Sequence, residues 1–297
     1  MKAPVVLFAY NRPRLLEEAI RSLSNADGAD ETELFIFVDG PRTDADAPKV
    51  SESLRIAREA GGFGKVHVQA SDRNRGLAAS VIAGVGEVIS AAGKVIVLED
   101  DLRVTKDFLA WMNAALDRYE GSEKVFSVCG YSNRVRIPKS YPYDGYFCPR
   151  NASWGWGTWQ DRWASVDWQP TPGQVESEGR AFDKWGGSDC RSMLLSWMRG
   201  DTDSWAIRFN FNEFMHGRVS LFPVRSHVDP SAGFDGSGTH CRRYSRFKFD
   251  LVSGTVPEKG FSFPEQTEVI PSIRRSALSY HSIPARAWSR LMYLLHD

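Results

Sequence analysis

Three consecutive carboxylates, Glu99, Asp100 and Asp101, close a short apolar run at residues 95–98. The run is rich in β-branched residues and nothing polar interrupts it, which predicts a buried strand. In open α/β sheets, ligands bind at the carboxyl ends of such strands. Three adjacent acids repel one another unless they share a positive charge, and Mg²⁺ or Mn²⁺ bridging to a phosphate supplies it. A solvated acidic turn is the alternative interpretation.

Polar side chains also follow two earlier predicted strands. Tyr10, Asn11 and Arg12 follow the first strand, and Asp39 follows the second. Because the carboxyl ends of parallel strands meet at one edge of a sheet, one crevice could collect these groups and the acidic run. The set suits a nucleoside diphosphate, since an Asp accepts hydrogen bonds from a base or ribose and an Arg pairs with phosphate. Taken singly, Asp39 could belong to a turn and Arg12 could be a surface cation.

Tryptophan is concentrated in one segment, because five of the ten tryptophans lie between residues 154 and 168. Trp154 and Trp156 flank Gly155. In such a loop an indole can stack on a pyranose face, and the glycine lets the backbone approach a sugar. Core packing is the alternative. We prefer it for Trp159 and Trp163, which fall at helical spacing with Trp156 and predict a helix there.

The first half of the chain alternates in the βαβ manner, which predicts an α/β fold with a mostly parallel sheet and helices on both faces. The expected strands are 5–9, 34–38, 65–70, 95–98 and 125–129, and the expected helices are 13–23, 47–60, 77–92 and 106–119. After residue 130 we expect strands at 146–148 and 219–222, helices at 189–199, 204–215 and 284–295, and a mobile glycine-rich loop at 234–240. The predicted domain is 1–241, with halves 1–130 and 131–241, followed by a basic extension at 242–297.

Composition excludes several classes of protein. The 297 residues carry 37 basic and 37 acidic side chains, so no basic field attracts nucleic acid, and we expect no nucleic-acid partner. The four cysteines are scattered, which predicts reduced thiols in a cytosolic protein. We find no signal peptide and no apolar run near the roughly 20 residues that span a bilayer. No glycine-rich loop of the dinucleotide-binding or P-loop type follows the first strand.

Together these motifs resemble GT-A-fold glycosyltransferases, and within them the group related to N-acetylglucosaminyltransferase I, in the manner of a family 2-like bacterial enzyme. The matching segments are Tyr10-Asn11-Arg12-Pro13, Val38-Asp39-Gly40, Leu98-Glu99-Asp100-Asp101-Leu102 with Asp107-Phe108, Trp154-Gly155-Trp156 through Trp163, and Asp203-Ser204-Trp205. The resemblance implies a GT-A, Rossmann-like fold and an inverting, metal-dependent transfer of a sugar from a nucleotide donor, most often a UDP-sugar. It does not extend beyond Cys241.

The resemblance also implies roles for the candidate residues. Asp101 would be the direct ligand of Mn²⁺ or Mg²⁺, while Glu99 and Asp100 would contact the ribose or donor sugar and the water shell of the metal. Asp39 would face the uracil. The implied nucleotide-sugar contacts are Tyr10, Asn11, Arg12, Asp39, Arg75, Glu99, Asp100, Trp154, Gly155 and Trp156.

The acceptor hydroxyl needs a carboxylate base, and the resemblance favours Asp203. The alternative is that Asp203 caps the helix that begins at Ser204. Asp201 and Asp235 are the other candidates for the base. His240, at the end of the glycine-rich loop, is a further candidate for contact with phosphate or metal, although a lone histidine is more often structural.

The expected function is transfer of a sugar, N-acetylglucosamine or a related hexose, from a UDP donor to a glycan or glycolipid acceptor in the synthesis of surface polysaccharide such as lipopolysaccharide. A sugar nucleotidyltransferase and a catalytically silent carbohydrate-binding module are the alternatives. The arginine-rich tail at 242–297, with its leucine-bearing terminal helix, suits an anionic membrane surface, whereas a solvated basic surface is the other interpretation. We expect a cytoplasmic location, with peripheral contact at the inner face of the membrane.

Overall fold

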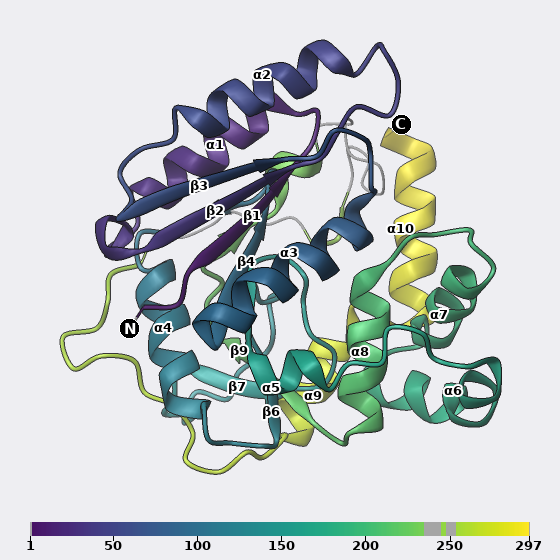
Figure 1. Cartoon of the computed structure of the whole chain (residues 1–297). Coiled ribbons are helices and arrows are strands. Elements are labelled where there is room, and N and C mark those ends of the chain that lie inside the picture. The colour runs from purple at the N-terminus through teal and green to yellow at the C-terminus, as the bar shows by residue number, and fades with distance from the viewer. Residues whose placement is uncertain (1, 235–244, 248–253, 297) are drawn as a thin grey trace.

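A computed structural model describes residues 2–234, 245–247 and 254–296, arranged around one eight-stranded sheet (Figure 1). Its strands are β1 (Val5–Ala9), β2 (Glu33–Val38), β3 (Lys65–Ala70), β4 (Lys94–Glu99), β6 (Val125–Cys129), β7 (Gly145–Cys148), β8 (Trp156–Trp159) and β9 (Val219–Pro223). They lie in the order β3-β2-β1-β4-β8-β6-β9-β7. Only β8 and β7 oppose the common strand direction. The carboxyl ends of β1, β2 and β4 therefore meet at one edge. A short pair, β5 (Arg103–Val104) and β10 (Val228–Asp229), forms a second sheet.

The helices of the described residues are α1 (Pro13–Ser24), α2 (Ala47–Arg58), α3 (Leu77–Ala92), α4 (Phe108–Tyr119), α5 (Gln160–Ala164), α6 (Pro172–Gly186), α7 (Cys190–Met198), α8 (Trp205–Met215), α9 (Pro271–Ser279) and α10 (Ile283–His296). Every strand and helix expected before residue 130 is present. Helices α6 and α9 were not predicted. For α6 a signal existed, because Thr171 and Gln174 form a capping box around a proline at the helix start.

Alternate side chains of β1 enter two separate cores. Val5 and Leu7 pack with α1, α2 and α4, whereas Val6 and Phe8 pack with α3, α5 and α8. Figure 1 shows α1 and α2 on one side of the sheet and α3 on the other. These strand residues are almost fully buried, and each such side chain stabilises the fold by about 1.5–3 kcal/mol. The predicted α/β fold with helices on both faces is confirmed.

The helix predicted from the spacing of Trp156, Trp159 and Trp163 is wrong over its first half. Trp156 and Trp159 lie on β8, which pairs with both β4 and β6, and α5 begins only at Gln160. Two ladders of backbone hydrogen bonds override the side-chain spacing. All three indoles are buried, so the preference for core packing at Trp159 and Trp163 is confirmed.

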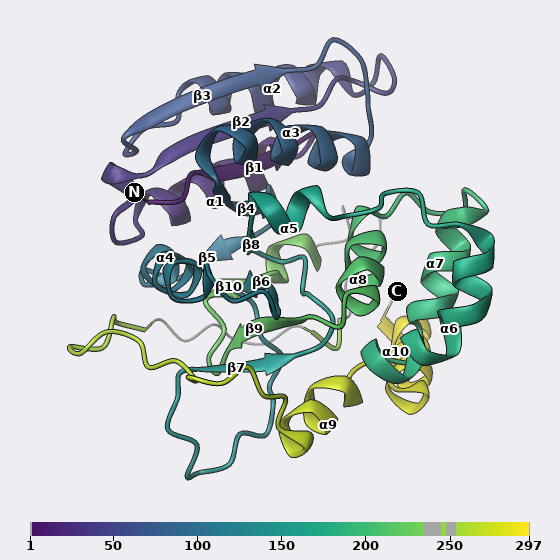
Figure 2. The same cartoon turned by 60° about the horizontal axis from the view of Figure 1, so that its bottom comes forward.

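The helices that follow residue 170 cover one end of the sheet. Helices α6, α7 and α8 share an apolar cluster, and Figure 2 shows them grouped with α10. Helix α9 packs on β7 and β9 through Ile273 and Ala277. The predicted boundary at residue 130 falls within the continuous sheet, because strands from both sides of it pair together. No helix among the described residues is both long and apolar enough to cross a bilayer.

Three of the cysteines are buried free thiols. Loss of solvation raises the pKa of Cys148 and of Cys190 to about 12 in each case, so both thiols stay protonated and unreactive at neutral pH. Cys129 is likewise buried. The fourth, Cys241, lies outside the described residues.

Glu213 on α8 is a fully buried carboxyl that joins three segments. Its Oε2 accepts the main-chain N–H of Asn151 at 3.0 Å, and its Oε1 accepts the hydroxyl of Ser220 at 2.8 Å. Loss of solvation raises the pKa of Glu213 to about 8 from an ordinary value of 4.5. Because the folded pKa is the higher one, this group's stabilising contribution is fully present below pH 4.5 and is lost as the pH rises through about 8.

We expect Glu213→Gln to flatten the pH dependence of stability, because the neutral amide cannot ionise. Relative to this variant, the wild-type protein should lose about 5 °C of melting temperature between about pH 5 and pH 8. Differential scanning calorimetry across that range measures the effect. Glu176→Gln, on an exposed position of α6, is the matched control and should follow the wild type. Parallel curves for wild type and Glu213→Gln would contradict the assigned pKa.

Candidate functional site

The acidic run lies at the carboxyl end of β4, at the same edge as the ends of β1 and β2. The side chain of Asp100 is only 2% exposed, whereas that of Asp101 is 21% exposed. Loss of solvation, together with the neighbouring carboxylates, raises the pKa of Glu99 to about 8. For Asp100, loss of solvation outweighs the charge of Arg12 and raises its pKa to about 6. The run therefore buries Asp100 and leaves Glu99 and Asp101 partly exposed, and the raised pKa values favour the protonated forms of Glu99 and Asp100.

Arg12 compensates part of this charge. It immediately precedes α1, where Pro13 occupies the first helical position. Its guanidinium contacts Asp100 and donates a hydrogen bond to Oδ2 of Asp101 at 2.9 Å. Burial lowers the pKa of Arg12, but the two carboxylates raise it, and the net shift is upward. The structure thus pairs Arg12 with the acidic run inside the predicted crevice, while its contact with a nucleotide stays a prediction.

The donor set at Asp101 fits a hard divalent cation that is held mainly by its substrate. Oδ1 of Asp101 accepts no hydrogen bond from the described residues, so one carboxylate oxygen is available. Within those residues, no three His, Cys, Asp or Glu side chains gather as a metal cage. Mg²⁺ and Mn²⁺ need none, because one or two carboxylates, water and phosphate oxygens suffice. A Cβ at Gly233 would lie 2.6 Å from Oδ2 of Asp101, so only a glycine fits against this carboxylate.

Asp39, just after β2, is bound by the loop that precedes α3. Its carboxylate accepts the main-chain N–H groups of Arg75 at 2.9 Å and Gly76 at 3.0 Å, and the side-chain amide of Asn74 at 3.1 Å. The N–H of Gly40 donates to it at 2.9 Å. These donors occupy most of the acceptor sites of a carboxylate. Asp39 therefore positions residues 74–76 and has little acceptor capacity left for the predicted contact with uracil.

Other predicted nucleotide contacts surround the same edge. The amide of Asn11 donates to Asp46 at 2.8 Å, and the hydroxyl of Tyr10 accepts the N–H of Arg42 at 3.0 Å. These bonds fasten the exit of β1 to the segment before α2. The side chain of Arg75 is exposed, and its contact with a nucleotide stays a prediction.

Asp203 lies directly before α8. Ser204 caps this helix, because its hydroxyl accepts the N–H of Ile207 at 3.3 Å. The alternative that Asp203 is the cap is therefore wrong, and its side chain is 61% exposed. A Cβ at Gly76 would lie 3.1 Å from Oδ2 of Asp203. The exposed carboxylate thus approaches the loop at residues 74–76 that Asp39 holds.

Of the other two candidates for the base, the structure describes only Asp201. Asp201 accepts a hydrogen bond from Arg199 at 2.8 Å. Asp235 lies outside the described residues, and so does His240, the predicted contact of metal or phosphate. Arg208 lies 3.9 Å from Asp203, which is too long for a direct hydrogen bond and leaves that carboxylate open.

The structure separates the two tryptophans of the aromatic loop. Trp154 is half-buried and meets Tyr131 edge-on, with ring centroids 4.8 Å apart. Trp156 is fully buried and stacks on Trp205 at 4.9 Å. Trp156 therefore presents no face to a ligand, whereas Trp154 is partly exposed. Gly155 allows close packing, since a Cβ there would lie 2.7 Å from a side chain of β10.

Several residues that shape the site were not predicted from the sequence. Asn74 and Gly76 bind Asp39, although an Asn-Arg-Gly sequence directly before an apolar helix was a visible signal. The approach of Gly233 to Asp101 had no such signal. Asp107 lies 2.9 Å from Nδ1 of His227, and despite its loss of solvation, hydrogen bonds from its neighbours lower its pKa to about 2. Asp107 lies at the start of α4 and His227 directly precedes β10, so this buried pair connects α4 to the segment that leads to Gly233.

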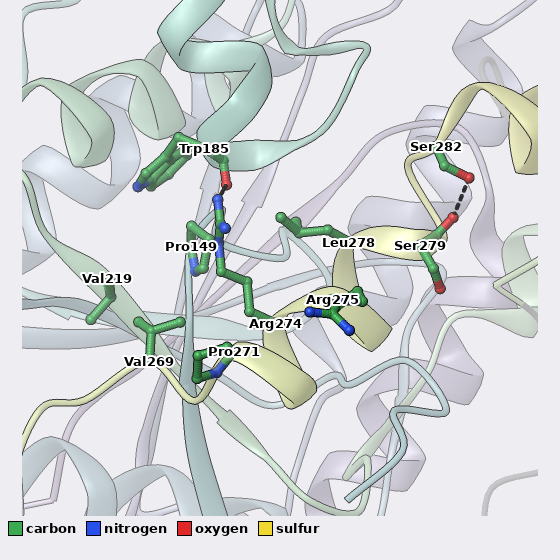
Figure 3. A pocket seen from close by; sticks show the side chains of 10 residues that line it. All are labelled: Pro149, Trp185, Val219, Val269, Pro271, Arg274, Arg275, Leu278, Ser279 and Ser282. Carbon is green, nitrogen blue, oxygen red and sulfur yellow. Dashed lines mark hydrogen bonds between the residues drawn. The ribbon is translucent and has the colours of Figure 1, made fainter.

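A separate hollow of about 740 Å³ lies between α9 and the end of α6 (Figure 3). Arg274 borders it and donates to the main-chain oxygen of Trp185 at 3.2 Å. Val219, where β9 begins, also lines it. Since β9 runs in the same direction as β4, this hollow lies at the edge of the sheet opposite the acidic run. It is therefore not part of the candidate site.

A model of glycosyl transferase family 2 matches residues 5–164, which is more than half of the chain. This chain belongs to glycosyltransferase family 2. The matched segment carries Arg12, Asp39 and Asp101 at the sheet edge described above, while Asp203 lies beyond it. The mixed, mostly parallel sheet of the chain, with its C-terminal helices, is the GT-A-like fold that the sequence predicted. The narrower resemblance to the N-acetylglucosaminyltransferase I group stays a prediction.

Solved structures similar to this family 2 member include S. aureus TarS 1–349, at 11% identity and a TM-score of 0.40 over 79% of this chain and 63% of that chain. The mannosyltransferase PcManGT from Pyrobaculum calidifontis, in complex with GDP-Man and Mn²⁺, is 13% identical, with a TM-score of 0.39 over 73% and 69%. Mannose-1-phosphate geranyltransferase from Thermus thermophilus is 14% identical, with a TM-score of 0.38 over 79% and 77%. This chain spans less than two thirds of the TarS chain, and these likenesses concern the fold alone.

Proposed function

We propose that this chain transfers a sugar from a UDP-sugar to a hydroxyl of a glycan or glycolipid, with inversion and with Mn²⁺ or Mg²⁺ bound. The observation that carries the proposal is the partly exposed carboxylate of Asp101, whose Oδ1 accepts no hydrogen bond from the described residues, beside the buried Asp100 that pairs with Arg12. A second exposed carboxylate, Asp203, approaches the loop at residues 74–76. Sugar transfer needs one carboxylate for the cation and a separate one for proton transfer.

Each group at the site has a distinct task in this proposal. A bound cation would neutralise the charge that develops on the leaving diphosphate. Asp101 would hold it, and Arg12 orients the acids through its ion pairs. The exposed Arg75 pairs with phosphate. Asp203 accepts the proton of the acceptor hydroxyl while that oxygen attacks the sugar from the side opposite the diphosphate, which inverts the configuration.

A thermal-shift screen of UDP-, GDP- and dTDP-sugars, with and without Mn²⁺, tests the donor class. We expect UDP-N-acetylglucosamine or a related UDP-hexose with Mn²⁺ to raise the melting temperature most, because a ligand at a hundredfold of its Kd stabilises the folded state by about 2.7 kcal/mol. Stabilisation by GDP-mannose and not by UDP-sugars would contradict the donor. UDP release in the presence of donor and Mn²⁺ excludes the silent-module alternative, since such a module binds glycan and releases none.

We also propose that α10 rests on an anionic membrane surface, which would place the enzyme beside glycolipid acceptors of surface polysaccharide. Trp288, Leu291 and Leu295 recur at helical spacing, and each is about half exposed or more. Residues 271–296 contain four arginines and no acidic residue. An exposed apolar helix face in a basic segment has the chemistry of an interfacial helix, with the tryptophan suited to the headgroup region.

Vesicle co-sedimentation tests this contact. We expect the protein to bind phosphatidylglycerol vesicles and to bind phosphatidylcholine vesicles more weakly. The double change Trp288→Ser and Leu291→Ser should weaken binding by about tenfold or more, because it removes buried apolar area from the helix face. Met215→Ser, at an exposed apolar position on α8, is the matched control and should bind like the wild type. Equal binding by the double variant would exclude α10 as the contact.

A further inference from the structure

A second cavity, of about 230 Å³, lies between α8, α9 and residues 149–154. Ala206 and Asn210 contribute to it from α8, and Ala277 contributes from α9. Trp154, Tyr131 and Phe247 add aromatic walls. Its volume is below the roughly 300–1,000 Å³ typical of drug-sized ligand sites, so it suits one ring-sized group.

Two of the residues that line this cavity, Asn151 and Asn210, have buried side-chain oxygens without a hydrogen-bond partner among the described residues. Each of the two residues is 5% exposed. Their amide nitrogens are engaged: that of Asn151 donates to Ser127 at 2.7 Å, and that of Asn210 donates to the main-chain oxygen of Asn151 at 3.4 Å. A buried acceptor without a donor destabilises the folded state. The cavity therefore favours a ligand that carries hydroxyl or N–H donors.

The charged groups of the cavity are already neutralised. Arg150 donates to both oxygens of Asp189, at 2.6 and 3.2 Å. Burial, followed by the charge of Arg150, lowers the pKa of His281 to about 4, so its ring is neutral at physiological pH. With no free cation among the described residues that line it, the cavity offers little to a phosphate or carboxylate. Aromatic walls combined with acceptor oxygens suit a neutral sugar, whose ring has apolar faces and hydroxyl donors.

Two segments connect the cavity to the candidate active site. The ring of Trp154 lies 6.3 Å from that of Phe234, and Phe234 follows Gly233, which touches Asp101. On the other side, Ala206 lies in the first turn of α8, three residues after Asp203. A group in the cavity would therefore be flanked by the segments that carry the proposed metal ligand and the proposed base.

We infer that this cavity binds a neutral sugar unit of the acceptor, with Asn151 and Asn210 accepting hydrogen bonds from its hydroxyls. The inference rests on the proposed function, in which the acceptor is a glycan or glycolipid. The donor nucleotide occupies the edge around Asp101 and Arg75, so the two substrates take separate subsites. Asn151 and Asn210 determine acceptor affinity in this arrangement and leave donor binding unchanged.

Saturation-transfer NMR on the full chain tests the inference with methyl α- and β-glycosides of glucose, galactose, mannose and N-acetylglucosamine. We expect at least one glycoside to bind the wild-type protein and to bind Asn210→Leu about tenfold or more weakly, since the hydroxyl then loses its buried acceptor. Ser153→Trp, which fills the cavity from residues 149–154, should lose binding as well. Ser153→Ala leaves the cavity open and is the matched control.

Hydrolysis of UDP-sugar without any acceptor separates this inference from the proposed function. If the wild-type protein releases UDP but no glycoside binds, or if all variants bind the glycoside equally, the acceptor cavity is wrong and the proposed function stands. If glycoside binding is lost in Asn210→Leu and Ser153→Trp while no protein releases UDP from any donor, the sugar site is supported and the proposed function fails. Melting temperatures near that of Ser153→Ala show that each variant is folded.

Discussion

Asp203→Asn is expected to lower the rate of sugar transfer by about 10²–10⁴-fold while leaving donor affinity unchanged. The amide keeps the shape of the side chain but cannot accept a proton from the acceptor hydroxyl. Ser204 caps α8, so Asp203 is not needed for the helix, and its exposed carboxylate meets the loop at residues 74–76. Initial rates of UDP release with acceptor give the rate, and calorimetric titration of UDP-sugar with Mn²⁺ gives the affinity.

Asp201→Asn is the matched control, because Asp201 lies two residues away and is held by Arg199 at the surface. It should keep near-normal turnover. Near-normal turnover of Asp203→Asn would remove Asp203 from the base role. A large loss of turnover in both variants would show that the rate depends on the conformation of the segment before α8 and not on one carboxylate.

Asp101→Asn is expected to abolish the effect of Mn²⁺ on nucleotide binding and to lower kcat/KM by about 10²–10³-fold. A cation that stabilises the leaving diphosphate supplies several kcal/mol, and each 1.36 kcal/mol is about a tenfold change in rate. Asparagine keeps an oxygen for Arg12, so the fold at the end of β4 should survive. The readouts are UDP affinity with and without Mn²⁺ and the rate of UDP release.

Asp117→Asn removes a carboxylate from the surface pair with Lys94 and controls for a general change in charge. It should bind UDP with Mn²⁺ as the wild type does. If Asp101→Asn retained the wild-type response to Mn²⁺, the cation would have to be held elsewhere in the chain. In that case the division of the acidic run into one ligand and two supporting acids would be wrong.

The sheet edge could be predicted from the sequence because each of its strands is local. Apolar runs such as residues 5–9 and 95–98 are short, each is followed by polar residues, and helices with clear apolar faces separate them. Chain direction alone then brings Arg12, Asp39 and Asp101 to one edge, where the structure places them. These placements needed no knowledge of side-chain pairing.

What the sequence could not reveal depends on partners that are distant along the chain. Asp39 is bound by residues 74–76, and Arg12 is paired with Asp100, which is 88 positions later. Tryptophan is a residue type that stacks on sugars, but Trp156 lies on β8, which pairs with β4 on one side and β6 on the other, and its indole is buried. The sequence could not decide whether Asp203 or Ser204 caps α8, because Asp and Ser have similar preferences for a helix start.

The most direct test of the central claim, that Asp101 and Asp203 form a metal-dependent inverting transfer site, is time-resolved proton NMR of UDP-N-acetylglucosamine with the enzyme. In the presence of Mg²⁺ and an added acceptor glycoside, the α-linked donor should be consumed and the first-formed product signal should be β. Consumption should stop when Mg²⁺ is removed. A product with retained α configuration, or transfer that persists without a divalent cation, would exclude a metal-dependent inverting site.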